Sequence, residues 1–466
     1  MPRTIRIALI LLLIVVSPFF FFLTFQYFSR ASAIKADIRV DVRNTIGKMP
    51  DRWKAIAQGG EERGVRMLEN VVPDLAGLYP RSIRIDHIYD YYDVIARDNE
   101  GKLTFNFDSL DQTVCDIYHT GAKPFFVLGY MPEALSGDTT LISAPKNWDE
   151  WSLTVQKTIE HYSGKPTRLC GQITDFWTTD LYYEVWNEPD LETFGKWSLY
   201  GGQKDYKTLY YYSVLGANKA ENVNRFLIGG PVTTAAYQSW IQKFLDYVSE
   251  KQLRIDFISW HHYSKNPNDY VEDMKKMNDW LSPPQYEKYR NLPRIISEWG
   301  FDSDPNPIAD TNIGAAYTIS AIRNFINEKY EMAFLFEAKD GVEPRWGILG
   351  KYAERKPRYY ALKLFNLLSG NQIRVDGEGT FVQSVASQDG TMTTLILVNY
   401  DPDERNTESV PVEIKGLEQA IYSLEIRYID GNVIKLDNVE IPASGELKRN
   451  ILMQPNMVVA FSLKKV

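Results

Sequence analysis

The stretch Tyr182-Tyr183-Glu184-Val185-Trp186-Asn187-Glu188-Pro189 joins a short apolar strand to a polar turn, and this arrangement recurs along the chain. Eight apolar runs, separated by helical patterns, lie within residues 53–370. The expected strands are Trp53–Gln58, Ser82–His87, Pro124–Tyr130, Tyr182–Trp186, Phe226–Gly230, Asp256–Tyr263, Arg294–Trp299 and Ala333–Ala338. Near-continuous apolar strands alternating with helices predict a parallel sheet covered on both faces, and eight such units predict a closed (β/α)8 TIM barrel. An open doubly wound sheet is the alternative, but the sequence has no glycine-rich nucleotide-binding motif to support it.

The helical pattern stops near residue 371, and the rest of the chain alternates as β-strands do. Asp389-Gly390 and Asp430-Gly431 each separate two strand-like runs, which is the strongest short signal for a β-hairpin. Residues 371–466 therefore predict a small C-terminal β-sandwich. In the lead-in segment 34–52, the alternating pattern of Ile38–Val42 predicts a half-buried strand that joins this sandwich.

Residues 1–33 have the pattern of an export segment. Arg3 and Arg6 precede an unbroken apolar run, Ile7–Phe25, which approaches the length of about 20 residues that a membrane-spanning helix needs. This length favours an uncleaved signal anchor, whereas Ala31-Ser32-Ala33 resembles the cleavage site of a signal peptide. In both cases the rest of the chain is exported. We therefore expect an extracytoplasmic protein, held by the cell membrane or, after cleavage near Ala33, secreted or periplasmic.

Composition argues against several classes of partner. The 466 residues have a formal net charge of −8 without a basic stripe, so we expect no nucleic acid partner. The five histidines and two cysteines lack metal-site spacing, so we expect no metal and no cofactor. Cys115 and Cys170 could pair in an oxidising compartment, although we favour two unpaired buried thiols. Aromatic residues make up 13%, which fits either a large core or a cleft that stacks sugar rings.

Two glutamates end expected strands at the end of the barrel where active sites lie. Glu188 follows the fourth strand and Glu298 lies in the seventh, so they lie roughly across the barrel mouth. Cleavage of a glycosidic bond needs one protonated carboxyl group for the leaving oxygen and one further carboxylate. We expect Glu188, beside Asn187, to be the acid/base and Glu298 to be the nucleophile. A separation of about 5–5.5 Å would give retention of configuration, and roughly 6.5–9.5 Å would give inversion.

These motifs resemble clan A of the glycoside hydrolases and, within it, family 39. The resemblance covers roughly residues 43–370. It rests on Trp186-Asn187-Glu188-Pro189, Ser297-Glu298-Trp299, the third-strand stretch 124–135, Arg84 with Asp86-His87, Trp260-His261-His262-Tyr263, and Lys356-Pro357 with Tyr360-Ala361-Leu362. It implies a retaining mechanism with the roles given above for the two glutamates. Strand eight departs from the clan pattern, because Phe334-Leu335-Phe336-Glu337-Ala338 lacks the tryptophan that often lies under the sugar.

Further residues are expected to bind substrate. Arg84 lies between two isoleucines of strand two, and its buried charge needs a carboxylate partner, for which Glu298 is the candidate and another salt bridge the alternative. The end of strand six should place Tyr263 and one histidine in the sugar pocket, and we choose His262. The expected substrate-binding residues are Arg84, His87, Tyr130, Asn187, His262, Tyr263 and Trp299.

These expectations combine into a retaining glycosidase that cleaves a polysaccharide by double displacement. Family 39 includes β-xylosidases, α-L-iduronidases and bacterial endoglycosidases that act on exopolysaccharide. The export segment favours the last group, so the leading hypothesis is endo-acting cleavage of an extracellular or exported polysaccharide. The alternatives are an exo-acting, β-xylosidase-like glycosidase and a non-catalytic carbohydrate-binding component of an export assembly.

Overall fold

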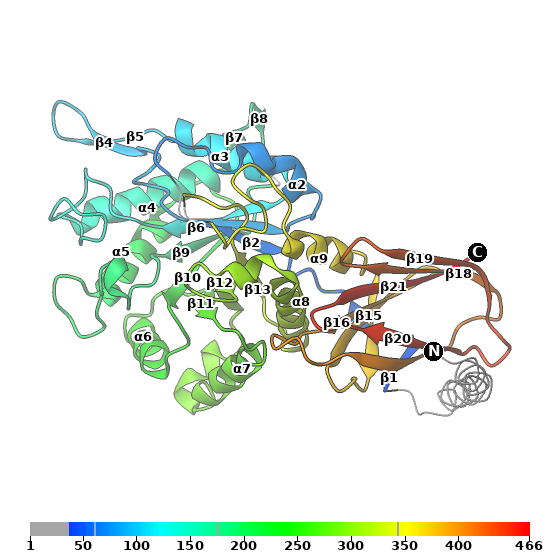
Figure 1. The fold of residues 1–466 in the computed structure, drawn as a ribbon. Helices are drawn as coiled ribbons and strands as arrows, with labels where there is room; N and C mark the ends of the chain where they lie inside the picture. Colours follow the sequence, from blue (N-terminus) through cyan, green and yellow to red (C-terminus); the bar gives the residue numbers. More distant parts are fainter. Residues whose placement is uncertain (1–36, 60–61, 175–176, 343) are drawn as a thin grey trace, which may run out of the picture.

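The larger part of the protein is a closed barrel of parallel strands (Figure 1). The computed structural model describes residues 37–466 except 60–61, 175–176 and 343. In chain order the barrel strands are β2 (Ala55–Gln58), β3 (Ser82–Ile85), β6 (Lys123–Leu128), β9 (Leu181–Val185), β10 (Phe226–Thr233), β11 (Phe257–Tyr263), β12 (Arg294–Gly300) and β13 (Met332–Phe336). Each overlaps one predicted strand, so the predicted eight-stranded parallel barrel is confirmed.

Helices cover the outside of the barrel (Figure 1). They are α2 (Val72–Ala76), α3 (Asp108–His119), α4 (Trp148–Tyr162), α5 (Tyr206–Lys219), α6 (Gln238–Glu250), α7 (Asp269–Trp280), α8 (Asn312–Asn327) and α9 (Pro357–Phe365). Helix α6 is typical, because Ile241, Phe244, Leu245 and Val248 recur at helical spacing and are all buried. Asn147 and Thr311 start α4 and α8 as N-cap residues, since each side chain accepts a hydrogen bond from a backbone amide of the first turn.

The interior of the barrel changes character along its axis. Inward-facing aromatic rings of Phe125, Phe257 and Phe334 pack together in a buried cluster, with Phe125 and Phe334 centroids 4.8 Å apart. On the neighbouring strands β9 and β3 the inward positions are polar toward the carboxyl end, where Tyr182 is followed by Glu184 and Ser82 by Arg84. The apolar cluster therefore forms a floor beneath polar side chains at the carboxyl ends of the strands.

The C-terminal part is a nine-stranded sheet in the order β19-β18-β21-β16-β15-β14-β1-β17-β20. Its strands are β1 (Ile38–Lys48), β14 (Asn371–Asp376), β15 (Val382–Asp389), β16 (Met392–Asn399), β17 (Glu408–Lys415), β18 (Ile421–Tyr428), β19 (Val433–Glu440), β20 (Leu447–Met453) and β21 (Val458–Lys465). Both predicted hairpins are present, because Asp389 pairs with Met392 and Arg427 with Val433.

One long strand explains why the predicted two-sheet sandwich is a single hydrogen-bonded sheet. β1 runs parallel to β17 over Ile38–Asp41 and antiparallel to β14 along its length, with register shifts between Val40 and Gly47. It thereby joins strands that would otherwise form separate sheets. Side chains from both halves of this sheet share one buried apolar cluster.

The sheet packs directly on the barrel beside α8 and α9 (Figure 1). Ser320 Oγ donates a hydrogen bond to Gln383 Oε1 at 2.6 Å, and the Tyr400 hydroxyl donates to the carbonyl of Lys265 at 2.7 Å. Ile396 and Ala460 belong to the same buried apolar cluster as the outer layer of the barrel. The two parts therefore share a continuous interface.

A disulfide bond corrects one expectation from the sequence. Cys115 on α3 and Cys170 are bonded, with their Cα atoms 5.5 Å apart, whereas we favoured two unpaired thiols. The pairing was hidden in the sequence because 55 positions separate the cysteines. Cys170 lies in the turn of the hairpin formed by β7 (Arg168–Leu169) and β8 (Gln172–Ile173), which meets α3.

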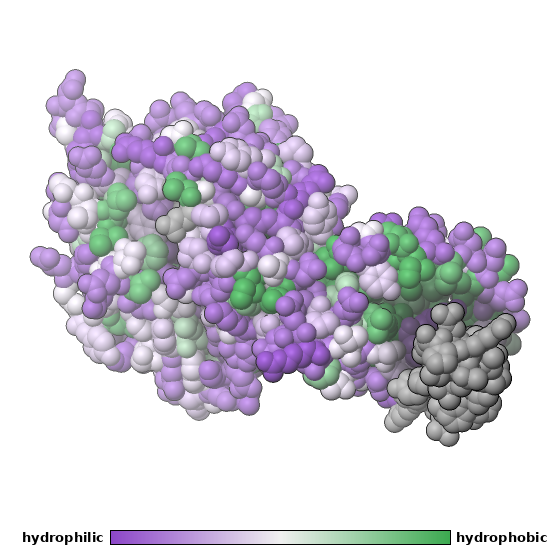
Figure 2. Space-filling view, in the orientation of Figure 1, coloured by the Kyte–Doolittle hydropathy of each residue, from purple (hydrophilic) through white to green (hydrophobic). Residues whose placement is uncertain are grey.

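The surface is mostly polar over the barrel, whereas apolar side chains gather over the β18–β19 end of the sheet (Figure 2). The exposed apolar residues there are Ile421, Val433, Ile434 and Leu436. None of the helices described between residues 37 and 466 is long and apolar enough to cross a membrane. The predicted export segment Ile7–Phe25 lies outside the described residues.

Candidate active site

A sharp turn after β9 brings Glu188 over the barrel mouth. Trp186 and Glu188 have φ angles of 72° and 42°, in the left-handed region that non-glycine residues rarely adopt. The surrounding contacts hold this turn, because Trp186 is buried and its indole donates to the carbonyl of Phe194 at 2.9 Å. The amide of Glu188 donates to the carbonyl of Val232 at 3.1 Å. Backbone strain of this kind is typical of functional sites, where the surroundings fix an unfavourable conformation.

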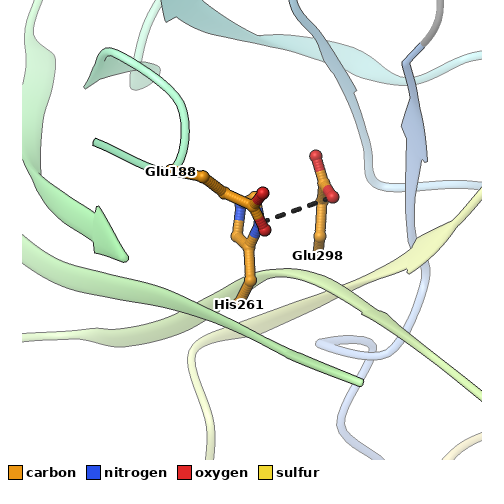
Figure 3. A group of neighbouring side chains, drawn as sticks. All are labelled: Glu188, His261 and Glu298. Carbon is orange, nitrogen blue, oxygen red and sulfur yellow. Dashed lines mark hydrogen bonds and ion pairs between the residues drawn. The ribbon is translucent and has the colours of Figure 1, made fainter. Parts of the chain in front are cut away.

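Glu298 reaches the same place from β12, across the barrel. Figure 3 shows its carboxylate facing that of Glu188, with the ring of His261 beside both. His261 Nδ1 lies 2.8 Å from Glu188 Oε1 and 3.4 Å from Glu298 Oε2. A carboxylate oxygen of Glu188 and one of Glu298 lie within 4.8 Å of each other. Two acidic side chains separated by 110 positions in the sequence therefore face one small space.

Arg84 organises the centre of the site from β3. Its side chain is fully buried and hydrogen-bonds to the side chains of four residues. Nε lies 2.9 Å from Glu184 Oε2, Nη1 lies 2.7 Å from Glu298 Oε1, and Nη2 lies 3.4 Å from His261 Nε2. Nη2 donates to Asn187 Oδ1 at 2.8 Å. Burial opposes the positive charge, but the carboxylates of Glu184 and Glu298 outweigh it and raise the pKa of Arg84. The predicted pairing of Arg84 with Glu298 is thus present.

The carboxylate of Glu298 is held at both oxygens. Arg84 donates to Oε1, and the hydroxyl of Tyr263 donates to Oε2 at 2.9 Å. Burial raises the pKa of Glu298, while the positive charges of His261 and Arg84 act in the opposite direction. Burial and the charge of Glu298 also raise the pKa of Tyr263 well above its ordinary value, so its phenol remains a donor at neutral pH. Glu298 is therefore a positioned carboxylate with two fixed donors.

His261 lies between the two glutamates, and the charges of both affect its pKa. Burial lowers its pKa, but the charges of Glu298 and Glu188 outweigh burial and leave the pKa raised. Glu188, His261 and Glu298 also form the group whose ligand atoms come close enough to share a cation, among the residues the structure describes. The guanidinium of Arg84 already supplies a positive charge at Glu298. The ligand atoms of Glu188, His261 and Glu298 are therefore suited to acid–base chemistry as well as to cation binding.

Four predicted site residues meet around the glutamates. Asn187 accepts from Arg84 and donates through Nδ2 to the hydroxyl of Tyr130 at 2.8 Å. Tyr263 contacts Glu298, as described above. His87 lies at the rim, where its ring centroid is 4.5 Å from that of Tyr130. Its Nδ1 lies 2.6 Å from an oxygen of Asp90.

Two predicted substrate-binding residues point away from the mouth. His262 Nδ1 lies 2.5 Å from Asp273 Oδ2 on α7, and the ring of Trp299 is fully buried against Phe325 of α8. Successive strand residues face opposite sides, so the neighbours His261 and Glu298 face the barrel interior instead. The structure therefore does not bring His262 and Trp299 into the group around the glutamates.

The structure adds residues that sequence reasoning missed or placed elsewhere. His261 shares its strand face with Tyr263, so the alternation of β11 could have identified it. Asp86 is almost completely buried at the end of β3, and its Oδ1 has no hydrogen-bond partner among the described residues. Glu337 is buried at the end of β13, where burial and the charge of Asp340 raise its pKa well above the ordinary value. In the sequence, Asp86 was part of a family motif and Glu337 part of strand eight, but neither was predicted as a site residue.

The loop after β13 supplies an aromatic side chain near the end of strand eight. The ring centroid of Trp346 lies 6.0 Å from that of Phe336. The backbone of Trp346 also accepts a hydrogen bond from the amide of Glu337 at 2.9 Å. The tryptophan expected in strand eight itself is absent, but a tryptophan from the following loop lies beside this strand.

Comparison with known proteins identifies the family. The model of glycosyl hydrolases family 39 matches residues 36–434. A β-xylosidase from Caldicellulosiruptor saccharolyticus is 27% identical over 361 residues, which cover 71% of each chain. A β-xylosidase from Geobacillus stearothermophilus is 28% identical over 320 residues, which cover 62% of this chain and 61% of the relative.

Solved structures show the same fold at low sequence identity. A GH39 enzyme from Xanthomonas axonopodis pv. citri has a TM-score of 0.74 at 19% identity, covering 94% of this chain and 99% of the other. A monomeric β-xylosidase from Caulobacter crescentus CB15 also has a TM-score of 0.74, at 21% identity, covering 92% of this chain and 99% of the other. The family match extends over the barrel and most of the sheet, and the chain therefore belongs to glycosyl hydrolase family 39 and is a glycosidase.

Proposed function

We propose that this glycosidase cleaves an exported or extracellular polysaccharide with retention of configuration, using Glu298 as nucleophile and Glu188 as acid/base. The observation that carries this proposal is the approach of the two carboxylates, whose closest oxygens lie within 4.8 Å. Retaining enzymes have carboxyl groups about 5–5.5 Å apart, whereas inverting enzymes leave room for a water molecule at roughly 6.5–9.5 Å. The short spacing favours direct attack by one carboxylate on the sugar.

The first step forms a covalent ester. Glu298 attacks the anomeric carbon while Glu188 protonates the glycosidic oxygen, so the bond to the leaving group breaks and the leaving group takes that proton. Arg84 and Tyr263 hold the two oxygens of Glu298 and so orient the attack. His261, 2.8 Å from Glu188, helps to position the acid.

The second step releases the sugar. Glu188, now ionised, takes a proton from a water molecule, and the oxygen of that water attacks the anomeric carbon. The bond to Glu298 breaks and the carboxylate is restored. Two inversions at one carbon give net retention.

A cavity beside the rim favours internal cleavage of a chain. A space of about 690 Å³ is lined by residues of the loops that follow β3 and β6. Asp90 lines this cavity, lies 2.6 Å from His87 and accepts a hydrogen bond from the amide of Tyr130 at 3.2 Å. Asp90 thus connects this cavity to His87, and binding space on that side would suit an endo-acting enzyme, which must hold sugar units on both sides of the cleaved bond. Because two relatives are β-xylosidases, exo action is the second candidate.

The disulfide favours an extracytoplasmic location. Disulfides persist in oxidising compartments and are rare in the cytosol, so the Cys115–Cys170 bond fits an exported protein. The apolar run Ile7–Phe25, with Arg3 and Arg6 before it, fits an N-terminal membrane anchor or a cleaved signal peptide. We therefore include the cell membrane as a proposed partner of the N-terminal segment.

The proposal is tested by two isosteric variants and a control. Glu188→Gln and Glu298→Gln should each lose nearly all release of reducing ends from polysaccharide. Glu272→Gln, at an exposed position on α7, should keep wild-type activity. An endo-acting enzyme gives products of several lengths early in the digestion of an oligosaccharide ladder, whereas an exo-acting enzyme releases only terminal units. Wild-type rates in both glutamate variants would end the proposal.

A further inference from the structure

Two exposed tyrosines follow strands four and five on the Glu188 side of the mouth. Tyr200 lies in the loop between β9 and α5, and Tyr237 directly precedes α6. Their side chains are 79% and 43% exposed, respectively. A tyrosine ring is a large apolar surface with a polar tip, and exposed aromatic groups beside a site often mark a binding surface.

Hydrogen bonds connect Tyr237 to the turn that carries the acid. The amide of Glu188 donates to Val232 at the end of β10. Two positions further on, the amide and hydroxyl of Thr234 donate to the carboxylate of Asp190 at 2.9 and 2.5 Å. The hydroxyl of Tyr237 lies 3.2 Å from Thr234 Oγ1. Tyr237 is therefore fixed relative to Glu188 through two adjacent loops.

A cation holds Tyr200 against the same helix. Lys243 Nζ, on α6, lies 3.8 Å from the ring centroid of Tyr200 and also contacts its hydroxyl. Because Tyr237 precedes the first turn of α6 and Lys243 lies in the second, both rings belong to one edge of the mouth. The cation–π contact restrains Tyr200 without burying its ring.

We infer that Tyr200 and Tyr237 form a subsite for the sugar units on the leaving-group side of the cleaved bond. This inference rests on the proposed role of Glu188. An acid that protonates the leaving oxygen must lie on the side of the leaving group, so the chain beyond the cleaved bond passes over the loops next to Glu188. The apolar faces of sugar rings pack against the two tyrosine rings, and Lys243 and the phenol groups can hydrogen-bond to sugar hydroxyls.

This subsite gives a substrate-dependent effect. A substrate with a small aryl leaving group fills only the first position beyond the cleaved bond, whereas an oligosaccharide can extend over both tyrosines. Loss of one ring should therefore reduce kcat/KM for a hexasaccharide about 10-fold, the effect of losing roughly 1.4 kcal/mol of contact, and the double variant should lose more. Hydrolysis of aryl glycosides should stay within about twofold of wild type, because Glu188, Glu298 and Arg84 are unchanged.

The test compares Tyr200→Ala, Tyr237→Ala, the double variant and Tyr237→Phe with the wild type. The probes are p-nitrophenyl β-xyloside, β-glucoside, β-galactoside and β-mannoside, each with the hexasaccharide of the same sugar. Tyr237→Phe, which keeps the ring, should retain most hexasaccharide activity. Tyr79→Ala is the matched control, because Tyr79 is 69% exposed but lies three positions before the start of β3, at the end of the barrel opposite the mouth.

The possible failures are distinguishable. Unchanged hexasaccharide hydrolysis in the double variant, with an active wild type, would overturn the subsite and leave the proposed function intact. An equal loss on aryl glycosides and hexasaccharides would also overturn it, since the rings would then act on the catalytic centre. A wild type that hydrolyses no member of the panel would count against the proposed function itself.

Discussion

Replacing Arg84 with methionine removes the cation shared by two buried carboxylates but keeps a long side chain. Arg84 is fully buried and donates to Glu184, Glu298 and Asn187 at 2.7 to 2.9 Å. Methionine cannot donate any of these hydrogen bonds. Both carboxylates would remain in a place where water cannot replace the lost partner.

The size of the effect follows from this burial. Breaking a buried ion pair by removing one partner costs about 3–5 kcal/mol, because the other charge stays buried and uncompensated. By contrast, Arg81→Met should cost less than about 1 kcal/mol. Arg81 lies three positions earlier and is exposed, and its ion pairs with described residues are long, at 3.3 Å to Asp51 and 3.5 Å to Glu331. Adding Glu184→Gln to Arg84→Met should recover part of the loss, since it removes one uncompensated charge.

Activity should change along with stability. Arg84 lowers the pKa of Glu298, so its removal raises that pKa and keeps the nucleophile protonated up to a higher pH. The acidic limb of the kcat/KM profile should therefore move to higher pH in Arg84→Met, and kcat/KM should fall about 100-fold. Urea unfolding and pH–rate profiles of Arg84→Met and Arg81→Met give both quantities. Equal unfolding free energies in the two variants, with an unmoved acidic limb, would refute this reasoning.

Three other predictions concern single contacts. Folding raises the pKa of Glu337, so the stability of the wild type falls as the pH rises above about 4.3, the pKa of this group in the unfolded chain. The Glu337→Gln variant should therefore melt at a higher temperature than the wild type at pH 8 but not at pH 4. His261→Ala should lower kcat/KM far more than His262→Ala, because His261 contacts Glu188 whereas His262 contacts Asp273 on α7. Equal effects of the two substitutions on kcat/KM would contradict the orientations assigned to the two side chains. Cys115→Ser with Cys170→Ser should lose about 4 kcal/mol of unfolding free energy, from the 55-residue separation, and an unchanged value in non-reducing buffer would exclude the bond.

The barrel and the two glutamates were predictable because both depend on local pattern. Apolar runs alternating with helical segments identified all eight barrel strands, and a glutamate at a strand end must lie near the barrel mouth. The sequence also suggested Arg84 as the partner of Glu298, because a charge inside a barrel needs a partner.

The errors came from orientation and from long-range pairing. His262 and Trp299 were assigned by motif. Strand alternation places His262 on the face opposite Tyr263, and a register shift in β12 places Trp299 in the outer layer, where strict alternation from the inward-facing Ile295 would not. The disulfide joins α3 to a hairpin that is distant in the sequence, and no local sequence pattern predicts such a contact. The single nine-stranded sheet depends on β1 pairing with strands more than 320 positions away, which the hairpin signals could not reveal.

The burial of two acids was also invisible in the sequence. Asp86 and Glu337 lie in short polar stretches that resemble any strand end. Their burial arises only when the barrel closes and brings β3 and β13 to either side of β2. A single sequence contains no signal that β3 and β13 lie on either side of β2.

The proposed mechanism requires that Glu298 bonds to the sugar during the reaction. Incubation with 2-fluoro glycosides of a series of sugars slows the second step and traps the intermediate, and mass spectrometry of proteolytic peptides locates the label. We expect a stoichiometric label on Glu298 in the wild type and none in Glu298→Gln. A label on another residue, or turnover with inverted anomeric configuration by NMR, would contradict it.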